Sequence, residues 1–433
     1  MARSIAGLMA VALFCATNSA EAARPVGKVV PQETAQLYGL QRAWATRIEL
    51  DPSRGRLVNL RLESGLLLAQ TDQAAIHVLD AETRETLWIG HIGRPGSVTS
   101  APTANEKYVA STSGGELFLF DRPTGRVLWS RKLQSVPIAG PAISNERVYV
   151  PLVSGMITTF RLPDPNRKDE SPLEQKLNDN ALNYRGKGVT FSPPVVTREN
   201  IVWGTDAGNI YAVKPDDLLA IYRFKARGAV GGLMYRPPYV YATSRDGYVY
   251  ALREDKGTAR WQFSIGNPIA ETPMATDDGV YAIPETGGLY KLDPQTGQEL
   301  WAVPGVFQFV SASPTRLYTA DAAGRLLILN AKTGTRQGMI STEGLTIKVF
   351  NRENDRIYLA TATGLVQCLR EIGLKQPAWH ALVAVKDAEK SEGKAKGEGE
   401  EAKGKKPAAD EGPDPFGVED KTKDDPDDEK EDK

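Results

Sequence analysis

Histidines and cysteines are the first residues of this chain to consider for chemistry. The three histidines, His77, His91 and His380, lie apart in the sequence and do not have the spacing of metal ligands. Neither Cys15 nor Cys368 has a neighbouring cysteine or histidine that could complete a zinc site or a nucleophile and base pair. These five residues therefore predict no metal site and no nucleophilic catalysis.

Four carboxylates, Asp206, Asp246, Glu285 and Asp321, recur beside predicted turns. Oxygen ligands of this kind suit a hard cation such as Ca²⁺, and they could surround the mouth of a channel. Their constant position in glycine-containing turns instead favours bonding to the turn backbone. Asp-x-Asp calcium loops, a phosphate-binding loop and a Gly-x-Ser-x-Gly elbow are missing from the sequence. The sequence therefore predicts no catalytic, cofactor-binding or metal-binding residue.

A ten-residue unit that ends in tryptophan recurs along the chain. It reads LDPQTGQELW at residues 292–301, and close copies occupy residues 79–88, 120–129 and 252–261. The tryptophans that end these copies are Trp88, Trp129, Trp261 and Trp301. We expect their rings to insert between neighbouring sheets, because only an adjacent sheet can cover a bulky ring at the end of an outer strand. The weaker copy that ends in Gly338 lacks this ring and predicts a weaker contact.

Each unit describes a β-hairpin, because an apolar run, a polar Asp-x-x-Thr-Gly corner and a second apolar run follow one another. The corner glycine stands where a hairpin loop commonly needs a positive φ. A second glycine precedes the Asp-equivalent position by six residues in every unit except the first, where Ala74 replaces it. These predicted turn glycines are Gly115, Gly155, Gly208, Gly247, Gly287, Gly324 and Gly364.

The runs between the turns, such as residues 117–120 and 210–213, are apolar on both faces, which is typical of strands buried on both sides. The Asp-equivalent positions are about 40 residues apart, at 80, 121, 161, 214, 253, 293, 330 and 370. Each of the eight units holds four predicted strands. The sequence therefore predicts an all-β fold, an eight-bladed β-propeller of four-stranded antiparallel blades. A solenoid is the alternative, but it would leave sheet edges that ring closure removes.

The chain divides into stretches of different composition. The predicted divisions are a secretory signal peptide at 1–22, a linker at 23–37, the propeller at 38–383 with a charged, proline-rich insertion at 162–188, and a disordered charged tail at 384–433. In many propellers a strand from one terminus completes the blade made by the other. The strand around Trp44 and the region around Trp379 are both candidates for this closing strand.

The predicted signal peptide implies a periplasmic or extracellular protein. Phe14 before Cys15 argues against a lipid anchor, and no later stretch is apolar enough for a transmembrane helix. Residues 386–433 contain 11 lysines and 18 acidic residues, a charge of −7, so the chain total of −1 leaves +6 on the rest. Basic residues are dispersed through the units, which does not favour a nucleic-acid surface. The sequence leaves the oligomeric state open.

The repeated Leu-Asp-x-x-Thr-Gly-x-x-x-Trp unit, followed by Val-Tyr and a turn glycine, resembles the PQQ-like repeat family of eight-bladed propellers over about residues 40–380. The resemblance implies one of two functions. Some members are quinoprotein dehydrogenases that use pyrroloquinoline quinone (PQQ) with calcium. Others are non-enzymatic protein-binding scaffolds, such as the B subunit of the outer-membrane β-barrel assembly machinery.

The adjacent cysteines that lie over the quinone in many dehydrogenase members are absent from this sequence. We therefore expect a non-enzymatic periplasmic or secreted scaffold without a cofactor, which binds protein partners of the cell envelope through loops on one rim of the ring. A PQQ-dependent oxidoreductase with calcium is the alternative. A ligand-sensing or carbohydrate-binding ectodomain is a third possibility that the sequence leaves open.

Overall fold

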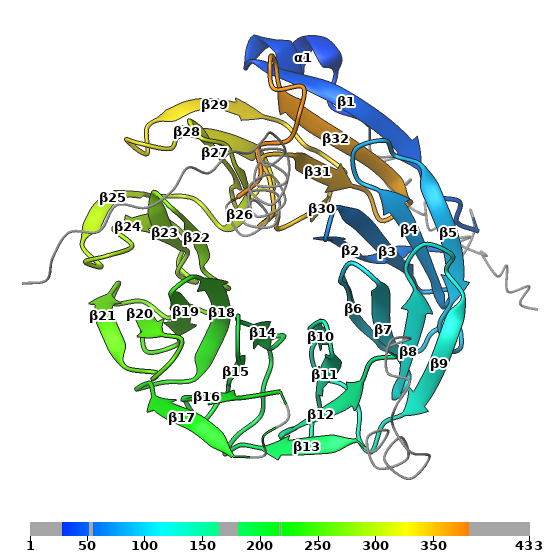
Figure 1. Cartoon of the computed structure of the whole chain (residues 1–433). Coiled ribbons are helices and arrows are strands. Elements are labelled where there is room, and N and C mark those ends of the chain that lie inside the picture. Colours follow the sequence, from blue (N-terminus) through cyan, green and yellow to red (C-terminus); the bar gives the residue numbers. More distant parts are fainter. Residues whose placement is uncertain (1–27, 52–54, 164–180, 216, 218, 381–433) are drawn as a thin grey trace, which may run out of the picture. The chain divides into compact units, whose positions relative to one another are not determined.

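The computed structural model describes residues 28–51, 55–163, 181–215, 217 and 219–380. In this part of the chain, eight four-stranded antiparallel sheets surround a central axis as the blades of a propeller (Figure 1). The predicted fold class is confirmed. The predicted signal peptide, most of the insertion and the predicted tail lie outside the described residues.

The blades are numbered in chain order. The strands of each blade are given from the innermost, next to the axis, to the outermost. The first four are blade 1 (β2 Leu57–Glu63, β3 Leu66–Thr71, β4 Ala75–Asp80, β5 Thr86–His91), blade 2 (β6 Thr99–Ala104, β7 Tyr108–Ser113, β8 Glu116–Asp121, β9 Val127–Lys132), blade 3 (β10 Ala142–Ile143, β11 Arg147–Pro151, β12 Met156–Arg161, β13 Leu182–Arg185) and blade 4 (β14 Val195–Val196, β15 Ile201–Gly204, β16 Asn209–Val213, β17 Ala220–Lys225). The others are blade 5 (β18 Val230–Arg236, β19 Tyr239–Ser244, β20 Tyr248–Arg253, β21 Ala259–Ser264), blade 6 (β22 Met274–Thr276, β23 Gly279–Ala282, β24 Leu289–Leu292, β25 Glu299–Val303), blade 7 (β26 Gln308–Ala312, β27 Arg316–Ala320, β28 Leu326–Asn330, β29 Arg336–Ile340) and blade 8 (β30 Ile347–Lys348, β31 Ile357–Ala360, β32 Leu365–Glu371, β1 Leu40–Arg47).

The N-terminal strand closes the ring. β1 pairs antiparallel with β32, from Leu40 opposite Glu371 to Arg47 opposite Leu365, and so supplies the outer strand of blade 8 (Figure 1). Of the two candidates from the sequence, the strand around Trp44 is therefore the closing strand. Trp379 forms only an isolated bridge with Asn354.

The inner strand of three blades is shorter than the sequence predicts. β10, β14 and β22 have two, two and three residues, where the sequence favours strands at 138–143, 191–196 and 269–275. Pro141, Pro194 and Pro273 directly precede them. Because proline has no backbone N–H to donate, the ladder begins only after it.

Tryptophans of the outer strands join one blade to the next. Their indole N–H groups donate to the carbonyl oxygen of the residue that follows the turn Asp of the next blade. The pairs are Trp44 to Ala81 at 3.1 Å, Trp88 to Arg122 at 2.6 Å and Trp261 to Pro294 at 2.9 Å. The ring and its N–H therefore both bind the neighbouring hairpin turn.

The glycine of that hairpin turn is required for two reasons. Gly125 has φ +69°, which an L side chain rarely adopts, and a Cβ atom there would lie 2.4 Å from Cδ2 of Trp88. Gly297 repeats this arrangement, with φ +73° and a Cβ position 2.5 Å from Cδ2 of Trp261. The glycine of one unit and the tryptophan of the preceding one are thus parts of a single contact.

Blade 7 has no tryptophan, and Tyr38 lies in its place. A Cβ atom at Gly338 would lie 2.3 Å from Cδ1 of Tyr38, and the Tyr38 carbonyl accepts a hydrogen bond from Arg316 Nη1 at 2.9 Å. Ile372, just after the outer end of β32, donates its N–H to the Gly39 carbonyl at 2.9 Å. The residues before β1 therefore contact both blade 7 and blade 8.

The described part of the predicted linker also packs against this seam. Residues 32–37 form α1 (Gln32–Leu37), and Ala35 is buried together with Val30 against side chains of blades 7 and 8. Part of the predicted linker at 23–37 is therefore helical, and Tyr38 lies at the seam of Gly338, which the sequence predicts to be weaker. The sequence does not predict this helix, because six residues are too few to show a helical period.

Tyr38→Ala should remove the ring that covers Gly338 and lower the free energy of unfolding by about 2 kcal/mol, less than for a fully buried aromatic ring. Tyr38→Phe keeps the ring and is the control. Urea denaturation of both variants measures the effect, and equal midpoints for wild type and Tyr38→Ala would contradict this assignment.

Lys291 is a buried lysine between blades 6 and 7. Its Nζ donates to the Ala331 carbonyl at 2.9 Å, and Ala331 follows the turn residue Asn330. The Ala331 carbonyl occupies the position at which an outer-strand tryptophan donates its indole N–H at other seams. Accordingly, Trp301 Nε1 is buried without a partner in the described structure, and its ring lies 6.0 Å from the ammonium. Burial lowers the pKa of Lys291, and the charge of Asp278 opposes this.

The lowered pKa of Lys291 makes stability depend on pH. Between that pKa and the ordinary lysine value of about 10.4, the unfolded chain binds more protons than the folded one, so stability rises with pH. We expect the unfolding free energy of the wild type, minus that of Lys291→Met, to increase as the pH rises toward the ordinary lysine pKa of about 10.4. Lys332→Met, at an exposed position of the next turn, should give a flat difference in the same denaturant titrations. A flat difference for Lys291→Met would rule out this coupling.

Candidate interaction surface

The structure brings two of the three histidines together, on one face of blade 1. His77 is buried on β4, and its pKa is lowered by burial and by the nearby His91, whereas Glu49 opposes the shift. His380 lies separately, after blade 8, where burial and Arg236 lower its pKa to about 4. Among the described residues, no three His, Cys, Asp or Glu side chains are grouped so that they could hold a metal ion.

Two of the four recurring carboxylates bond to the turns that carry them, and the other two bond to neighbouring segments. Asp206 accepts the Val189 N–H at 2.7 Å, and Asp246 accepts the Tyr248 N–H at 3.0 Å. Asp321 likewise accepts the Arg325 N–H at 2.9 Å. Glu285 forms an ion pair with Arg245 at 3.1 Å. Asp246 and Asp321 therefore bond to their own turns as their glycine context favoured, whereas Asp206 bonds the β13–β14 connection and Glu285 bonds blade 5.

The tryptophans and glycines selected from the sequence lie at blade seams and in turns. Trp88 and Trp261 are buried, whereas Trp129 and Trp301 are only partly buried. Trp129 approaches Phe160 of blade 3 with ring centroids 6.1 Å apart. The seven turn glycines have φ values from +75° to +86°, and Ala74 of the first unit has +60°. None of these positions carries a reactive group.

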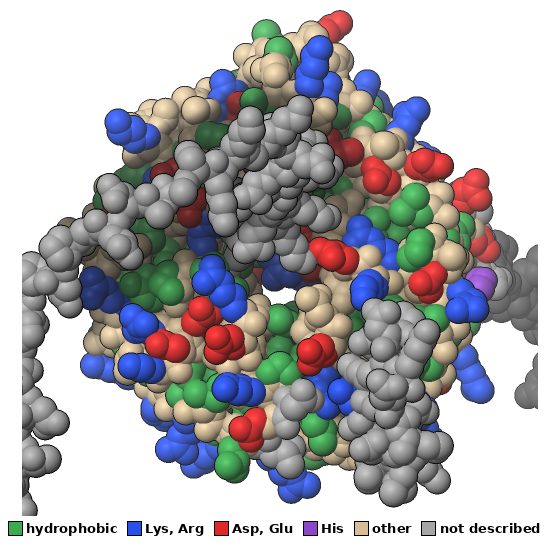
Figure 2. Space-filling model, viewed as in Figure 1, with side chains coloured by type: hydrophobic (Ala, Val, Ile, Leu, Met, Phe, Trp, Pro, Cys, Tyr) green, Lys and Arg blue, Asp and Glu red, His purple; other side chains and the backbone are tan. Residues whose placement is uncertain are grey.

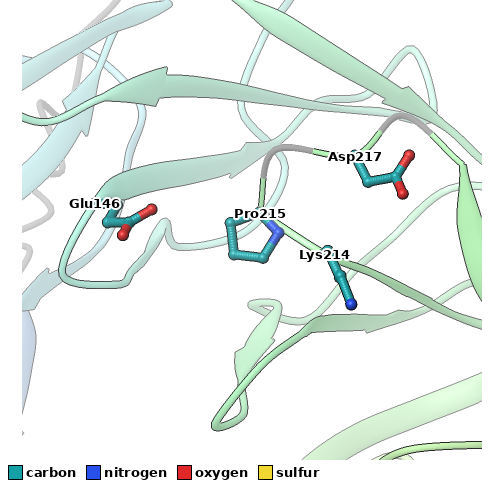
Figure 3. Close-up of a pocket in the computed structure, with 4 residues that line it drawn as sticks. All are labelled: Glu146, Lys214, Pro215 and Asp217. Carbon is teal, nitrogen blue, oxygen red and sulfur yellow. The ribbon is translucent and has the colours of Figure 1, made fainter.

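A shallow pocket of about 540 Å³ lies between blades 3 and 4 (Figure 3). It is lined by Glu146 of the β10–β11 turn and by Lys214, Pro215 and Asp217 of the β16–β17 turn. Tyr184 fixes one wall, because its hydroxyl donates to the Pro215 carbonyl at 2.8 Å. The pocket offers exposed charges of both signs but no nucleophile, so it does not resemble a catalytic site.

A cluster of charged side chains joins the β30–β31 turn of blade 8 to the β2–β3 turn of blade 1. The Glu353 carboxylate accepts the N–H groups of Ser64 at 2.5 Å and Gly65 at 3.0 Å, and Arg352 pairs with Glu63 at 3.0 Å. Burial and the charge of Glu63 raise the pKa of Glu353. The cluster therefore holds the two turns together.

Arg356, next to this cluster, is fully buried. It pairs with Glu82 of blade 1 at 3.2 Å and with Asp355 at 3.3 Å, and it donates to the carbonyls of Leu374 at 3.3 Å and Lys375 at 2.9 Å. One guanidinium thus holds the turn of blade 1, its own turn and the segment after β32.

Arg356→Ala should lower the free energy of unfolding by about 3–5 kcal/mol, because it leaves Asp355 and two carbonyls without their partner. Arg223→Ala, at an exposed position of β17, should change it by less than about 0.5 kcal/mol. Thermal and urea unfolding monitored by tryptophan fluorescence would measure both. A variant at Arg356 as stable as the control would show that the network contributes little.

Four exposed apolar side chains form an arc over blades 2 to 4. They lie in the connections that enter these blades and in the β11–β12 turn, on one rim of the ring. The members of this apolar arc are Val98, Val136, Val153 and Phe191, with exposed fractions of 76%, 54%, 48% and 60%. Sequence reasoning missed them, because single apolar residues in loops show no period.

The loops of the apolar arc are held in place by backbone hydrogen bonds. Val153 donates to the Val136 carbonyl at 2.9 Å, and Gly114 donates to the Val98 carbonyl at 3.0 Å. Val189, close to Phe191, is held by Asp206. The arc is therefore a preformed surface, which a partner can bind at a low cost in ordering.

Charges differ along the same rim. Exposed basic residues flank the apolar arc, among them Arg94, Lys132 and Lys187. On the same rim, the turns of blades 4 to 6 carry the carboxylates Asp206, Asp246 and Glu285 together with Arg245. The face shown in Figure 2 carries acidic and basic side chains intermixed around a central opening. The arc thus combines exposed apolar groups with flanking basic side chains.

A protein-family model described as "Outer membrane protein assembly factor BamB" matches residues 41–217 and 206–357. The chain belongs to this BamB family of PQQ-like repeat propellers. The predicted family is confirmed.

Curated BamB proteins are distant relatives. The chain is 22% identical over 324 residues to BamB of Moranella endobia, which covers 68% of this chain and 80% of that protein. It is 21% identical over 165 residues to BamB of Shewanella oneidensis, which covers 34% of this chain and 42% of the relative.

Solved structures share the fold. The crystal structure of BamB from Moraxella catarrhalis has a TM-score of 0.60 at 18% identity and covers 76% of this chain and 99% of its own. The C-terminal WD40 domain of Sif2 gives 0.59 at 12% identity, with 77% and 99% coverage. Because a WD40 domain fits almost as well as a BamB, function has to be argued from surfaces and not from the fold. Within the described residues, no helix is long and apolar enough to cross a membrane.

Proposed function

We propose that this protein is a non-enzymatic scaffold of the cell envelope that binds protein subunits during the assembly of outer-membrane proteins. The BamB family supplies the process, since its members are named as outer membrane protein assembly factors. The predicted signal peptide supports a periplasmic location. The apolar arc is the observation that carries the proposal.

The apolar arc places four side chains that are about half exposed or more on loops of one rim. Single exposed apolar residues are common, but a row of them on adjacent rigid loops is typical of a surface that another protein covers. Phe191 is the aromatic residue of the row, and aromatic side chains are enriched among residues that dominate binding energy. We therefore place the main contact at blades 2 to 4.

The basic residues beside the apolar arc define the partner further. Arg94, Lys132 and Lys187 lie around the apolar centre in the way that a polar rim surrounds the core of a protein interface. Electrostatic complementarity then favours a partner with an apolar patch flanked by carboxylates. Such a partner would associate more slowly at high salt.

Crosslinking in intact cells tests this function. A photoreactive amino acid at Val153 should capture a subunit of the outer-membrane assembly machinery, identified by mass spectrometry. The same amino acid at Leu300, which is 51% exposed on the outer strand of blade 6, is the matched control. The double variant Val136→Asp and Phe191→Asp should reduce recovery of that partner at least about tenfold, the equivalent of about 1.4 kcal/mol, with an unchanged melting temperature.

Two results would contradict the proposal. One is equal capture of the same proteins at Val153 and Leu300. The other is binding of PQQ with calcium by the purified protein, accompanied by dye reduction with alcohols or sugars, which would make the chain an oxidoreductase.

A further inference from the structure

One outer strand differs from all the others in charge. Seven of the eight described outer strands contain at least one Arg, Lys or Glu, and these are β1, β9, β13, β17, β21, β25 and β29. β5, with the sequence TLWIGH, contains none. Charged side chains on edge strands normally prevent other strands from pairing with them. β5 lacks this protection.

The backbone of β5 presents hydrogen-bonding groups at the free edge. Ile92 donates to the Ala74 carbonyl at 2.8 Å, and the register continues with Gly90 opposite Ile76 and Trp88 opposite Val78. In an antiparallel pair, residues alternate between bonding inward and pointing outward.

Because residues 88, 90 and 92 bond inward in this register, the N–H and C=O groups of Ile89 and His91 point away from β4. Among the described strands, β5 pairs with β4 alone, so no other strand of the ring occupies its outer edge. The two residues therefore offer backbone donors and acceptors to an added strand.

The side chains of β5 add an apolar strip to this edge. Leu87 and Ile89 are 42% and 48% exposed, while Trp88 and Gly90, on the opposite face, are buried. Ile89 and His91 are two residues apart and share one face of the strand, and the exposed Leu87 is the unpaired residue of the register shift beside them. A strand added beside β5 would place every second side chain on this strip.

We propose that β5 binds an extended, uncharged strand of a client outer-membrane β-barrel protein by β-strand addition. The chemistry of the edge selects this occupant, because a charged strand would bury its charges beside Leu87 and Ile89 without partners. Strands of membrane β-barrels alternate apolar and polar residues over about ten positions. The choice of client rests on the proposed function, whereas the free edge itself does not.

Peptide binding tests the proposal with the intact protein. The probe is a fluorescent peptide of alternating valine and threonine, about ten residues long, and fluorescence anisotropy measures its affinity. Ile89→Lys should weaken binding at least about tenfold, because it places a charge on the strip. Leu300→Lys on β25 is the matched control and should bind as the wild type does. Both variants should keep the wild-type melting temperature, since both side chains are about half exposed.

Hydrogen exchange distinguishes strand addition from a loose apolar contact. On peptide binding, the amides of Ile89 and His91 should exchange more slowly, while those of Leu300 and its neighbours should not change. Unchanged exchange at both amides, or equal affinity of the Ile89→Lys variant, would overturn the proposal. A third result would also overturn the proposal: the wild type forms a dimer, Ile89→Lys is a monomer, and neither binds the peptide. The β5 edge would then bind a second copy of the chain.

The same variants separate this inference from the proposed function. The double variant Val136→Asp and Phe191→Asp should bind the peptide normally. If crosslinking at Val153 is lost while the peptide still binds, only the proposed function is contradicted. If crosslinking at Val153 persists while the peptide does not bind, only the assignment of β5 is contradicted.

Discussion

The contact between an outer-strand aromatic ring and the hairpin turn of the next blade is the interaction on which this ring depends. It requires a ring at the end of one unit, a free carbonyl after the turn Asp of the next, and a glycine whose missing Cβ leaves room for the ring. Where the tryptophan is absent, another group takes its place. Tyr184 uses its hydroxyl to reach the equivalent Pro215 carbonyl, and Tyr38 covers Gly338 from outside the repeat.

Ring closure turns these local contacts into one rigid body. β1 joins blade 8 from the other end of the chain, and the buried Arg356 adds a second connection between blades 8 and 1. Removing a partner from such a buried network costs more than the same change on an exposed face, because the remaining charge and carbonyls stay desolvated. Backbone hydrogen bonds connect the rim loops to one another, as between Val153 and Val136 and between Gly114 and Val98. That is the property a binding scaffold needs.

The two proposed binding sites use different parts of this frame. The apolar arc lies on loops at one rim of blades 2 to 4, where side chains determine what binds. The free edge of β5 lies on the outside of blade 1, where the backbone does most of the binding and alternate side chains add selectivity. A scaffold with both sites could hold an assembly subunit and an unpaired strand at the same time. Neither site needs a catalytic group.

The sequence alone determined the repeat, the number of blades and the turn positions, because each of these follows from short patterns that recur at a constant interval. Those patterns also predicted that the recurring carboxylates would bond to their own turns, which holds for Asp246 and Asp321, whereas Asp206 and Glu285 bond to neighbouring segments. Only the tertiary structure decided what joins residues far apart in the chain, such as the choice of Trp44 over Trp379 for closure and the place of Tyr38 over Gly338. The two proposed sites were hidden for the same reason. Apolar loop residues are ordinary until the ring places them on one rim, and an uncharged strand is unprotected only when no neighbour pairs with it.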